Sequence, residues 1–152
     1  MRTVIQRVSE ASVDVGGERV AGITTGLLAL VAVVPTDTES DVAATVDKVA
    51  NLRIFPDGDG RMNRSLIDIE GDILVVSQFT LAGNVRRGRR PSFTGAADPT
   101  VAEPMVGDVA AGFAALGLDV STGVFGASME VALVNDGPVT FVIDTAYGSV
   151  VD

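Results

Sequence analysis

Alternating apolar and polar residues open the chain and predict a long β-strand. Residues 4–15 are rich in β-branched side chains and alternate apolar with polar, a period that places every second side chain on the same face of a strand. Gly16-Gly17 follows, and two glycines supply the positive φ angles of a tight hairpin. We therefore expect a hairpin whose return strand spans residues 18–23.

Two apolar runs indicate strands that are covered on both faces. Residues 27–34 are continuously apolar, and residues 72–78 have the apolar centre Ile73-Leu74-Val75-Val76. Such runs are typical of buried strands. A shorter strand is expected at residues 52–55, before the turn sequence Pro56-Asp57-Gly58-Asp59-Gly60.

Helical spacing occurs in two segments of the chain. Residues 38–50 place three valines on one face, behind Asp37 or Thr38 as the capping residue. The second helix has Asp98 as N-cap and Pro99 at its first position, and Gly117 ends it. Its expected apolar stripe is Met105, Val109, Phe113 and Leu116. Pro104 lies within the helix and predicts an irregular first turn.

The remaining pattern completes an α/β fold. Residues 82–97 form a long loop of basic, small and proline residues, and strands are expected at 119–124, 129–134 and 139–144. Two helices cannot cover both faces of so many strands. We expect one layered domain over residues 1–152, with a curved mixed sheet, both helices on one face and a possible tail at 147–152. The other face is then covered by more sheet or by a second subunit.

The composition restricts the chemistry. The chain has 152 residues and neither cysteine nor histidine. A Ser-His-Asp triad, a thiolate nucleophile and a zinc site of His or Cys ligands are therefore excluded. Asp57 and Asp59 lack the closing glutamate of a calcium loop and are interpreted as a turn. We expect no metal and no cofactor.

Charge and hydropathy limit the partners. The formal net charge is −9, which argues against wrapping long nucleic acids but not against binding a short terminus. No apolar run approaches the roughly 18 residues of a membrane span, and the first residues lack the apolar run of a signal peptide. We expect a cytoplasmic protein without a membrane partner.

Four short segments carry candidate chemistry, and each has a structural alternative. Ser77, Gln78, Phe79 and Thr80 end a strand before a loop, where binding groups are common, but such residues more often only satisfy backbone groups. Asn135-Asp136-Gly137-Pro138 has the composition of a hairpin turn, which is favoured over a site. Phe125 and Met129 are equally suited to a pocket or to the core. The cluster Arg86, Arg87, Arg89 and Arg90 is suited either to phosphate binding or to a solvated surface.

The combination of motifs resembles the D-aminoacyl-tRNA deacylase family over nearly the whole chain. The segments Ser77-Gln78-Phe79-Thr80-Leu81 and Asn135-Asp136-Gly137-Pro138-Val139-Thr140 match the two signature motifs of that family. The other matching segments are Met1-Arg2, residues 4–8, 51–55 and 88–93, Phe125-Gly126-Ala127 and Met129. One departure is Ala82-Gly83, where the family often has a bulkier residue, and we expect it to loosen the loop.

The resemblance implies a homodimer with sites at the subunit interface. It implies that Gly137-Pro138 is a cis pair that enters the neighbouring subunit's pocket, accepts D-residues and glycine, and excludes L-residues by collision. Arg7 matches the arginine that holds this element, while Phe125 and Met129 match residues of the adenosine and aminoacyl pocket. The implied partner is a tRNA 3′ end that carries a D-amino acid, or glycine mischarged on alanine tRNA.

The resemblance leaves two chemical routes open. In the first, the 2′-hydroxyl of the terminal ribose assists attack by water, and backbone amides near Phe79 and Thr80 orient the ester. In the second, Thr80 is the nucleophile. The first is preferred because Thr80 has no evident base partner in a chain without histidine. A non-catalytic module that binds the tRNA 3′ end is the alternative function.

Overall fold

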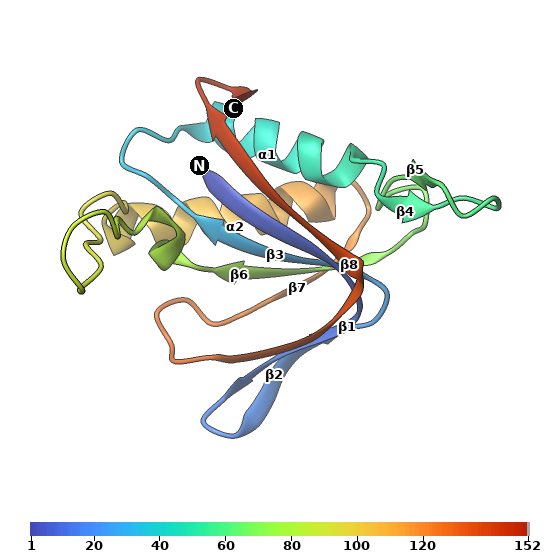
Figure 1. The fold of residues 1–152 in the computed structure, drawn as a ribbon, viewed down its shortest axis with the longest axis horizontal. Helices are drawn as coiled ribbons and strands as arrows, with labels where there is room; N and C mark the ends of the chain where they lie inside the picture. The colour runs from blue at the N-terminus through green and yellow to red at the C-terminus, as the bar shows by residue number, and fades with distance from the viewer. Residues whose placement is uncertain (152) are drawn as a thin grey trace.

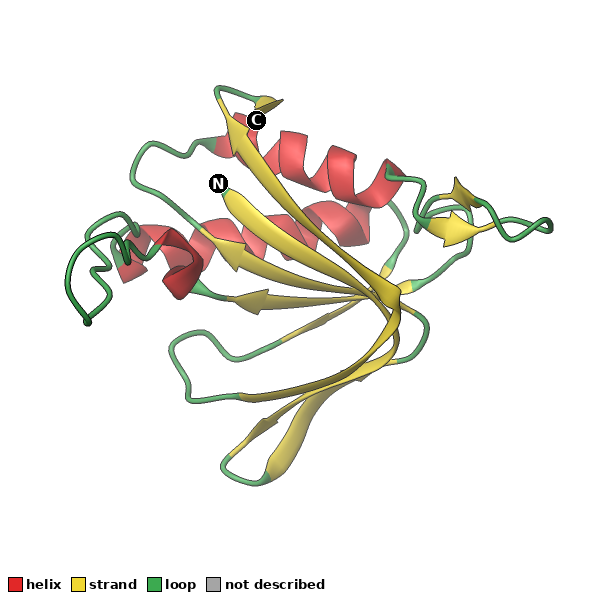
Figure 2. Cartoon of the chain, in the orientation of Figure 1, coloured by secondary structure: helices red, strands yellow, loops and turns green. Residues whose placement is uncertain are grey.

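A strongly curled mixed β-sheet with two α-helices on one side forms the fold (Figures 1 and 2). The computed structural model describes residues 1–151. The strands are β1 (Arg2–Val15), β2 (Glu18–Ile23), β3 (Gly26–Ala32), β4 (Phe55–Pro56), β5 (Met62–Arg64), β6 (Asp72–Ser77), β7 (Asp119–Thr122), β8 (Glu130–Ala146) and β9 (Ser149–Val151). The helices are α1 (Glu39–Asn51) and α2 (Pro99–Ala115), and a 3-10 turn, η1, spans Phe79–Ala82.

The main sheet has the order β7-β6-β3-β1-β8-β9, and β2 pairs with the second half of β1. The pairs β3–β6 and β6–β7 are parallel, and the other pairs of this sheet are antiparallel. The small hairpin β4–β5 stands apart beside the end of α1 (Figure 1). The expected fold class, a curved mixed sheet with both helices on one face, is confirmed.

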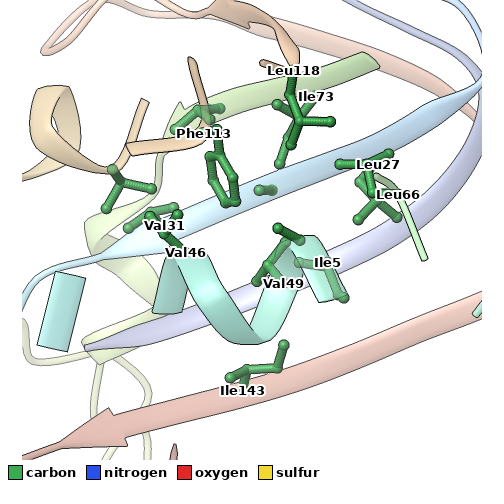
Figure 3. Packing of buried hydrophobic residues seen from close by; sticks show 14 of the residues in the cluster. Ile5, Leu27, Val31, Val46, Val49, Leu66, Ile73, Phe113, Leu118 and Ile143 are labelled. Carbon is green, nitrogen blue, oxygen red and sulfur yellow. The ribbon is translucent and has the colours of Figure 1, made fainter. Parts of the chain in front are cut away.

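Two apolar clusters fill the two faces of the central strands. Leu27 and Val31 of β3 face the helices, whereas Leu28 faces the opposite side. Figure 3 shows Phe113 of α2 and Val49 of α1 lying over the helix-facing side chains. Both residues are completely buried, and burying such a side chain contributes about 1.5–3 kcal/mol. The two continuous apolar runs of the sequence therefore become strands covered on both faces, as expected.

The sheet itself covers the face that the helices leave open. In Figure 1 the second half of β1 and the first half of β8 curl round, so that the second half of β1 lies across from β6. There Val13 and Ile23 pack against Leu74 and Val76. Of the two expected covers for this face, more sheet is the one that the single chain provides.

A β-bulge in β1 makes this curl compatible with the sequence. Val8 pairs with Asn135 and Glu10 pairs with Val134, so Ser9 has no opposite residue. The extra residue shifts the alternation by one, and Val8 and Ala11, three positions apart, both enter the second cluster. The strand can therefore supply buried side chains to different faces of the sheet in its two halves.

Several expectations about single elements were wrong. Asn135–Pro138 is not a hairpin turn, because β8 continues through it as one strand along β1. α2 is helical on both sides of Pro104, and Leu116 is 46% exposed at its C-cap instead of completing the apolar stripe. Of the expected tail, residues 149–151 form β9, and Asp152 lies outside the described residues. Within residues 1–151, no helix has the length and apolarity needed to cross a membrane.

Candidate active site

The segment Ser77–Ala82 turns sharply where β6 ends. Gln78 still pairs with the neighbouring strand, because its N–H donates to the Val31 carbonyl at 2.7 Å, and η1 begins at the next residue. The Leu81 N–H then donates back to the Gln78 carbonyl at 3.1 Å. The first N–H groups of such a turn have no acceptor within the turn itself. The amides of Phe79 and Thr80 are in this position and are suited to bind an oxygen atom of a ligand.

The Thr80 hydroxyl has a partner but no base. The Gln78 side-chain amide donates to Thr80 Oγ1. Among the described residues this is the only side-chain hydrogen bond of the Thr80 hydroxyl, and no carboxylate is hydrogen-bonded to it. The hydroxyl is therefore oriented, but it has no base as a hydrogen-bond partner.

An apolar cavity of about 460 Å³ opens beside this turn. The parallel strands β3, β6 and β7 point the same way, so their carboxyl ends meet at one edge. Ser77 ends β6 there, and Val33 and Phe125 follow the ends of β3 and β7. The cavity's other walls are Phe79 of η1, the loop before α2 and the first turns of α2. Its full lining is Val31, Val33, Ser77, Phe79, Phe93, Ala96, Ala97, Asp98, Pro99, Ala102, Val106, Phe125 and Gly126. Three phenyl rings suit it to a flat, aromatic ligand.

Asp98 is the one acidic side chain in the cavity wall. The Thr100 hydroxyl and the Thr100 N–H both donate to its carboxylate, at 2.6 and 2.9 Å, and these hydrogen bonds lower the pKa of Asp98. The carboxylate is thus ionised and engaged as the expected N-cap of α2. The capping signal identified this residue in the sequence, but not its position at the cavity.

Four β8 residues, Asp136 to Val139, bulge out opposite a single β1 residue. Gln6 pairs with Thr140 and Val8 with Asn135, so these four residues face Arg7 alone. The Asn135 side-chain amide closes the base of the bulge by donating to the Arg7 and Val139 carbonyls, at 2.8 and 3.0 Å. The Gly137-Pro138 peptide bond is cis, as the resemblance implied. Gly137 and Pro138 are exposed at the tip.

The buried Arg7 side chain ties this bulge to the rest of the protein. Its Nε donates to the Asp136 carbonyl at 2.9 Å, and its terminal nitrogen donates to the Ile54 carbonyl beside hairpin β4–β5. The Asp136 carboxylate lies 3.3 Å from Nε. A planar guanidinium can satisfy two carbonyls in fixed directions at once, so Arg7 fixes the Gly137-Pro138 element relative to the protein.

The bulge and the cavity lie far apart in one chain. Arg7 pairs with Leu27, and Leu27 pairs with Ile73, so the bulge is level with Ile73 of β6. Ser77 lies four residues further along β6 and three strands across the sheet. At about 3.3 Å per residue and 4.8 Å per strand, the separation is roughly 20 Å. The two signature motifs therefore do not form one site within a single chain.

The four clustered arginines lie on a short hairpin next to the cavity. Asn84 and Ser92 exchange N–H···O bonds of 2.7 and 2.9 Å, which close the loop between them. All four arginines are exposed, and two of them line a hollow of about 430 Å³. We call residues 84–92 the arginine hairpin. Met129, in contrast, does not line the cavity, because it packs in the second cluster beneath Gly123.

We predict that Arg7→Lys destabilises the protein by about 1–3 kcal/mol, because a lysine cannot reach both carbonyls and one stays buried without a donor. Arg2→Lys is the matched control on the same strand. Arg2 pairs with Asp144 on the surface, where its side chain is 47% exposed, and the loss should stay below about 1 kcal/mol. Urea unfolding measures both free energies. Equal losses in the two variants would contradict the role of Arg7.

Proteins of known sequence resemble the chain over almost its full length. The family model described as D-Tyr-tRNA(Tyr) deacylase matches residues 4–144. A D-aminoacyl-tRNA deacylase of Herpetosiphon aurantiacus is 56% identical over 146 residues, which are 96% of this chain and 95% of the relative. A protein of the same name from Thermus aquaticus is 52% identical, over 96% of each chain.

Solved structures have the same fold. The structure of a protein named c-Myc DNA Unwinding Element Binding Protein superimposes with a TM-score of 0.90 at 37% identity, over 96% of this chain and 99% of that one. A second, described as a probable eukaryotic D-amino acid tRNA deacylase, has a TM-score of 0.80 at 20% identity over 93% and 97% of the two chains, and it supports the fold alone. On the match of residues 4–144 and the identity to its relatives, the chain belongs to the D-Tyr-tRNA(Tyr) deacylase family.

Proposed function

We propose that this protein hydrolyses the ester bond between a D-amino acid and the 3′ end of a tRNA. The observation that carries the proposal is the turn Ser77–Ala82, which presents a hydroxyl and backbone N–H groups at the rim of an apolar cavity. Relatives of 52–58% identity carry the name D-aminoacyl-tRNA deacylase. An aminoacylated 3′ end has the matching parts, a flat base next to a polar ester.

The arginine hairpin supports a nucleic acid as the substrate. Four arginines stand together next to the cavity on a chain whose net charge is −9. Guanidinium groups bind phosphate through paired, charge-assisted hydrogen bonds. With the terminal adenine among the rings of Phe79, Phe93 and Phe125, the preceding phosphates would reach the hairpin. The basic area is small, so it suits a single-stranded 3′ end that inserts into the cavity while the rest of the tRNA does not contact the protein.

We infer that water attacks the ester carbonyl with help from the 2′-hydroxyl of the terminal ribose. The water oxygen bonds to the carbonyl carbon, the bond from that carbon to the ribose 3′-oxygen breaks, and the water's proton ends on the 3′-oxygen. The amides of Phe79 and Thr80 would stabilise the developing oxyanion by about 3–4 kcal/mol each. The lack of a base at Thr80 favours this route over nucleophilic attack by its hydroxyl.

We infer further that the functional unit is a homodimer in which Gly137-Pro138 of one chain enters the cavity of the other. The separation of roughly 20 Å within one chain supports this arrangement, as does the exposure of the bulge tip. A rigid backbone element can exclude an L-side chain by collision and admit a D-side chain or glycine, including glycine on alanine tRNA. Selection then depends on backbone shape instead of side-chain chemistry.

The second candidate is a module that binds the tRNA 3′ end without hydrolysing it. The unactivated Thr80 hydroxyl is the observation that favours it. Both candidates require a tRNA end in the cavity, and they differ only in turnover.

The chirality of the released amino acid tests the proposed function. We expect rapid release of D-tyrosine from D-tyrosyl-tRNA and release from L-tyrosyl-tRNA near the uncatalysed rate, because the L-side chain would collide with Gly137-Pro138. Deacylation of the two radiolabelled substrates measures both rates. Equal hydrolysis of both would contradict selection by chirality, and tight binding with no hydrolysis of either would favour the binding module.

A tRNA that ends in 2′-deoxyadenosine tests the chemical route. We expect its D-tyrosyl ester to be hydrolysed about 10²–10⁴ times more slowly, the usual contribution of an assisting acid or base. Thr80→Ala should keep measurable turnover, because the backbone amide of residue 80 remains. The decrease in kcat should therefore stay below the roughly 10²-fold cost of a missing oxyanion donor. A trapped acyl-Thr80 in the wild type, together with no turnover by Thr80→Ala, would establish the nucleophilic route instead.

Mixing two inactive variants tests the shared site. Ala97→Trp fills the cavity, and Gly137→Ala places a Cβ 2.6 Å from the Val139 nitrogen at a positive φ of 151°. Each variant alone should be inactive. Refolded together in equal amounts, half of the dimers are mixed and carry one intact site of two, so about a quarter of the wild-type activity should return. If the mixture stays inactive while gel filtration shows mixed dimers, both elements act within one chain.

A further inference from the structure

Both ends of the arginine hairpin rest on η1. At one end, the Gly83 N–H donates to the Thr80 carbonyl at 2.9 Å. At the other end, the Phe93 ring stands edge-on against the Phe79 ring, with centroids 5.1 Å apart and an angle of 69° between the planes. Such edge-to-face pairs contribute beyond simple burial. The hairpin therefore continues directly from η1 along the chain, and the chain after it returns to η1 through the Phe93 ring.

Two glycines make this close packing possible. A Cβ at Gly83 would lie 2.8 Å from the Thr80 carbonyl oxygen and 3.0 Å from the Phe93 ring. A Cβ at Gly95 would lie 3.0 Å from the Ala82 carbonyl oxygen. Gly83 has an ordinary φ of −68°, so the lack of space, not the backbone angle, requires glycine there. The expectation that Ala82-Gly83 loosens the loop stays a prediction, and in the structure the missing side chain of Gly83 lets the loop pack closely against Phe93.

We propose that Phe93 is a positioning residue that couples phosphate binding on the arginine hairpin to the orientation of the Phe79 and Thr80 amides. The two Asn84–Ser92 bonds hold the ends of the hairpin together, so a phosphate that fixes the arginines also fixes Phe93. Phe93 then acts on η1 through the Phe79 ring. The inference rests on the proposed function, and it explains how a tRNA body would promote hydrolysis at its own terminus.

Comparison of a long and a short substrate tests this coupling. D-tyrosyl-tRNA offers phosphates to the hairpin, whereas the D-tyrosyl ester of adenosine offers none. The readout is the ratio of kcat on the tRNA to kcat on the adenosine ester. We expect Phe93→Leu to lower this ratio by about 10- to 100-fold, the scale of a misplaced reacting group, while KM rises by a similar factor for both substrates because Phe93 also lines the cavity. Phe93→Tyr keeps the ring edge and should restore the ratio.

Tyr147→Leu is the matched control. It also exchanges an aromatic ring for leucine, but that ring is 95% exposed and belongs to the turn before β9. Gly83→Ala is the second variant, because it crowds the same contact from the other side and keeps both rings. It should lower the ratio as Phe93→Leu does. If circular dichroism shows that Phe93→Leu does not fold, the ratio measured for Gly83→Ala tests the coupling instead.

Each outcome decides the proposal. If Phe93→Leu lowers kcat equally on both substrates, Phe93 only lines the cavity and the coupling is overturned. A rise in KM for the tRNA with unchanged kcat overturns it as well, because Phe93 would then only bind substrate. If the wild type hydrolyses D-tyrosyl-tRNA and neither variant changes the ratio, the coupling is overturned but the proposed function is not. No wild-type turnover of D-tyrosyl-tRNA overturns both.

Discussion

The fold depends on an unequal pairing between its two longest strands. β8 must pair with β1 on both sides of a point where four of its residues face Arg7 alone. Backbone groups in such a bulge lose their ladder partners and need others. The side chains of Arg7 and Asn135 replace these partners, by contacts to the carbonyls of Asp136, Val139 and Arg7 itself. The exposed Gly137-Pro138 tip is thereby tied into the sheet by hydrogen bonds at its base.

The opposite end of the same sheet forms the cavity. Parallel strands bring their carboxyl ends to one edge, and in this protein that edge holds Ser77, the η1 turn and Phe125. The apolar strands behind this edge are buried on both faces, so they resist displacement and hold the turn in place. The proposed route would depend on such rigidity, because it uses oriented N–H groups and a substrate hydroxyl in place of a histidine or cysteine side chain.

Local patterns in the sequence determined most of the elements. The double glycine before Glu18, the apolar centre of β6 and the Asp98-Pro99 cap each predict a structure through contacts within a few residues, and each prediction was confirmed. The signature motif around Ser77 was found only through its resemblance to a family, since its composition also suits an ordinary strand end. The lack of histidine and cysteine excludes a Ser-His-Asp triad and a thiolate nucleophile on composition alone, because the base of the triad and the thiol are missing from the chain.

Tertiary structure decided the features that depend on residues far apart in the chain. Asn135–Pro138 has the composition of a turn, and only pairing with β1, about 130 residues away, makes it a bulge in one strand. Phe93 lies in a segment that matches the family, but nothing in that segment indicates its contact with Phe79, which the missing side chains of Gly83 and Gly95 permit. The distance between the two signature motifs is likewise set by strand register. Local propensity acts over a few residues, whereas register and close packing are decided by the whole folded chain.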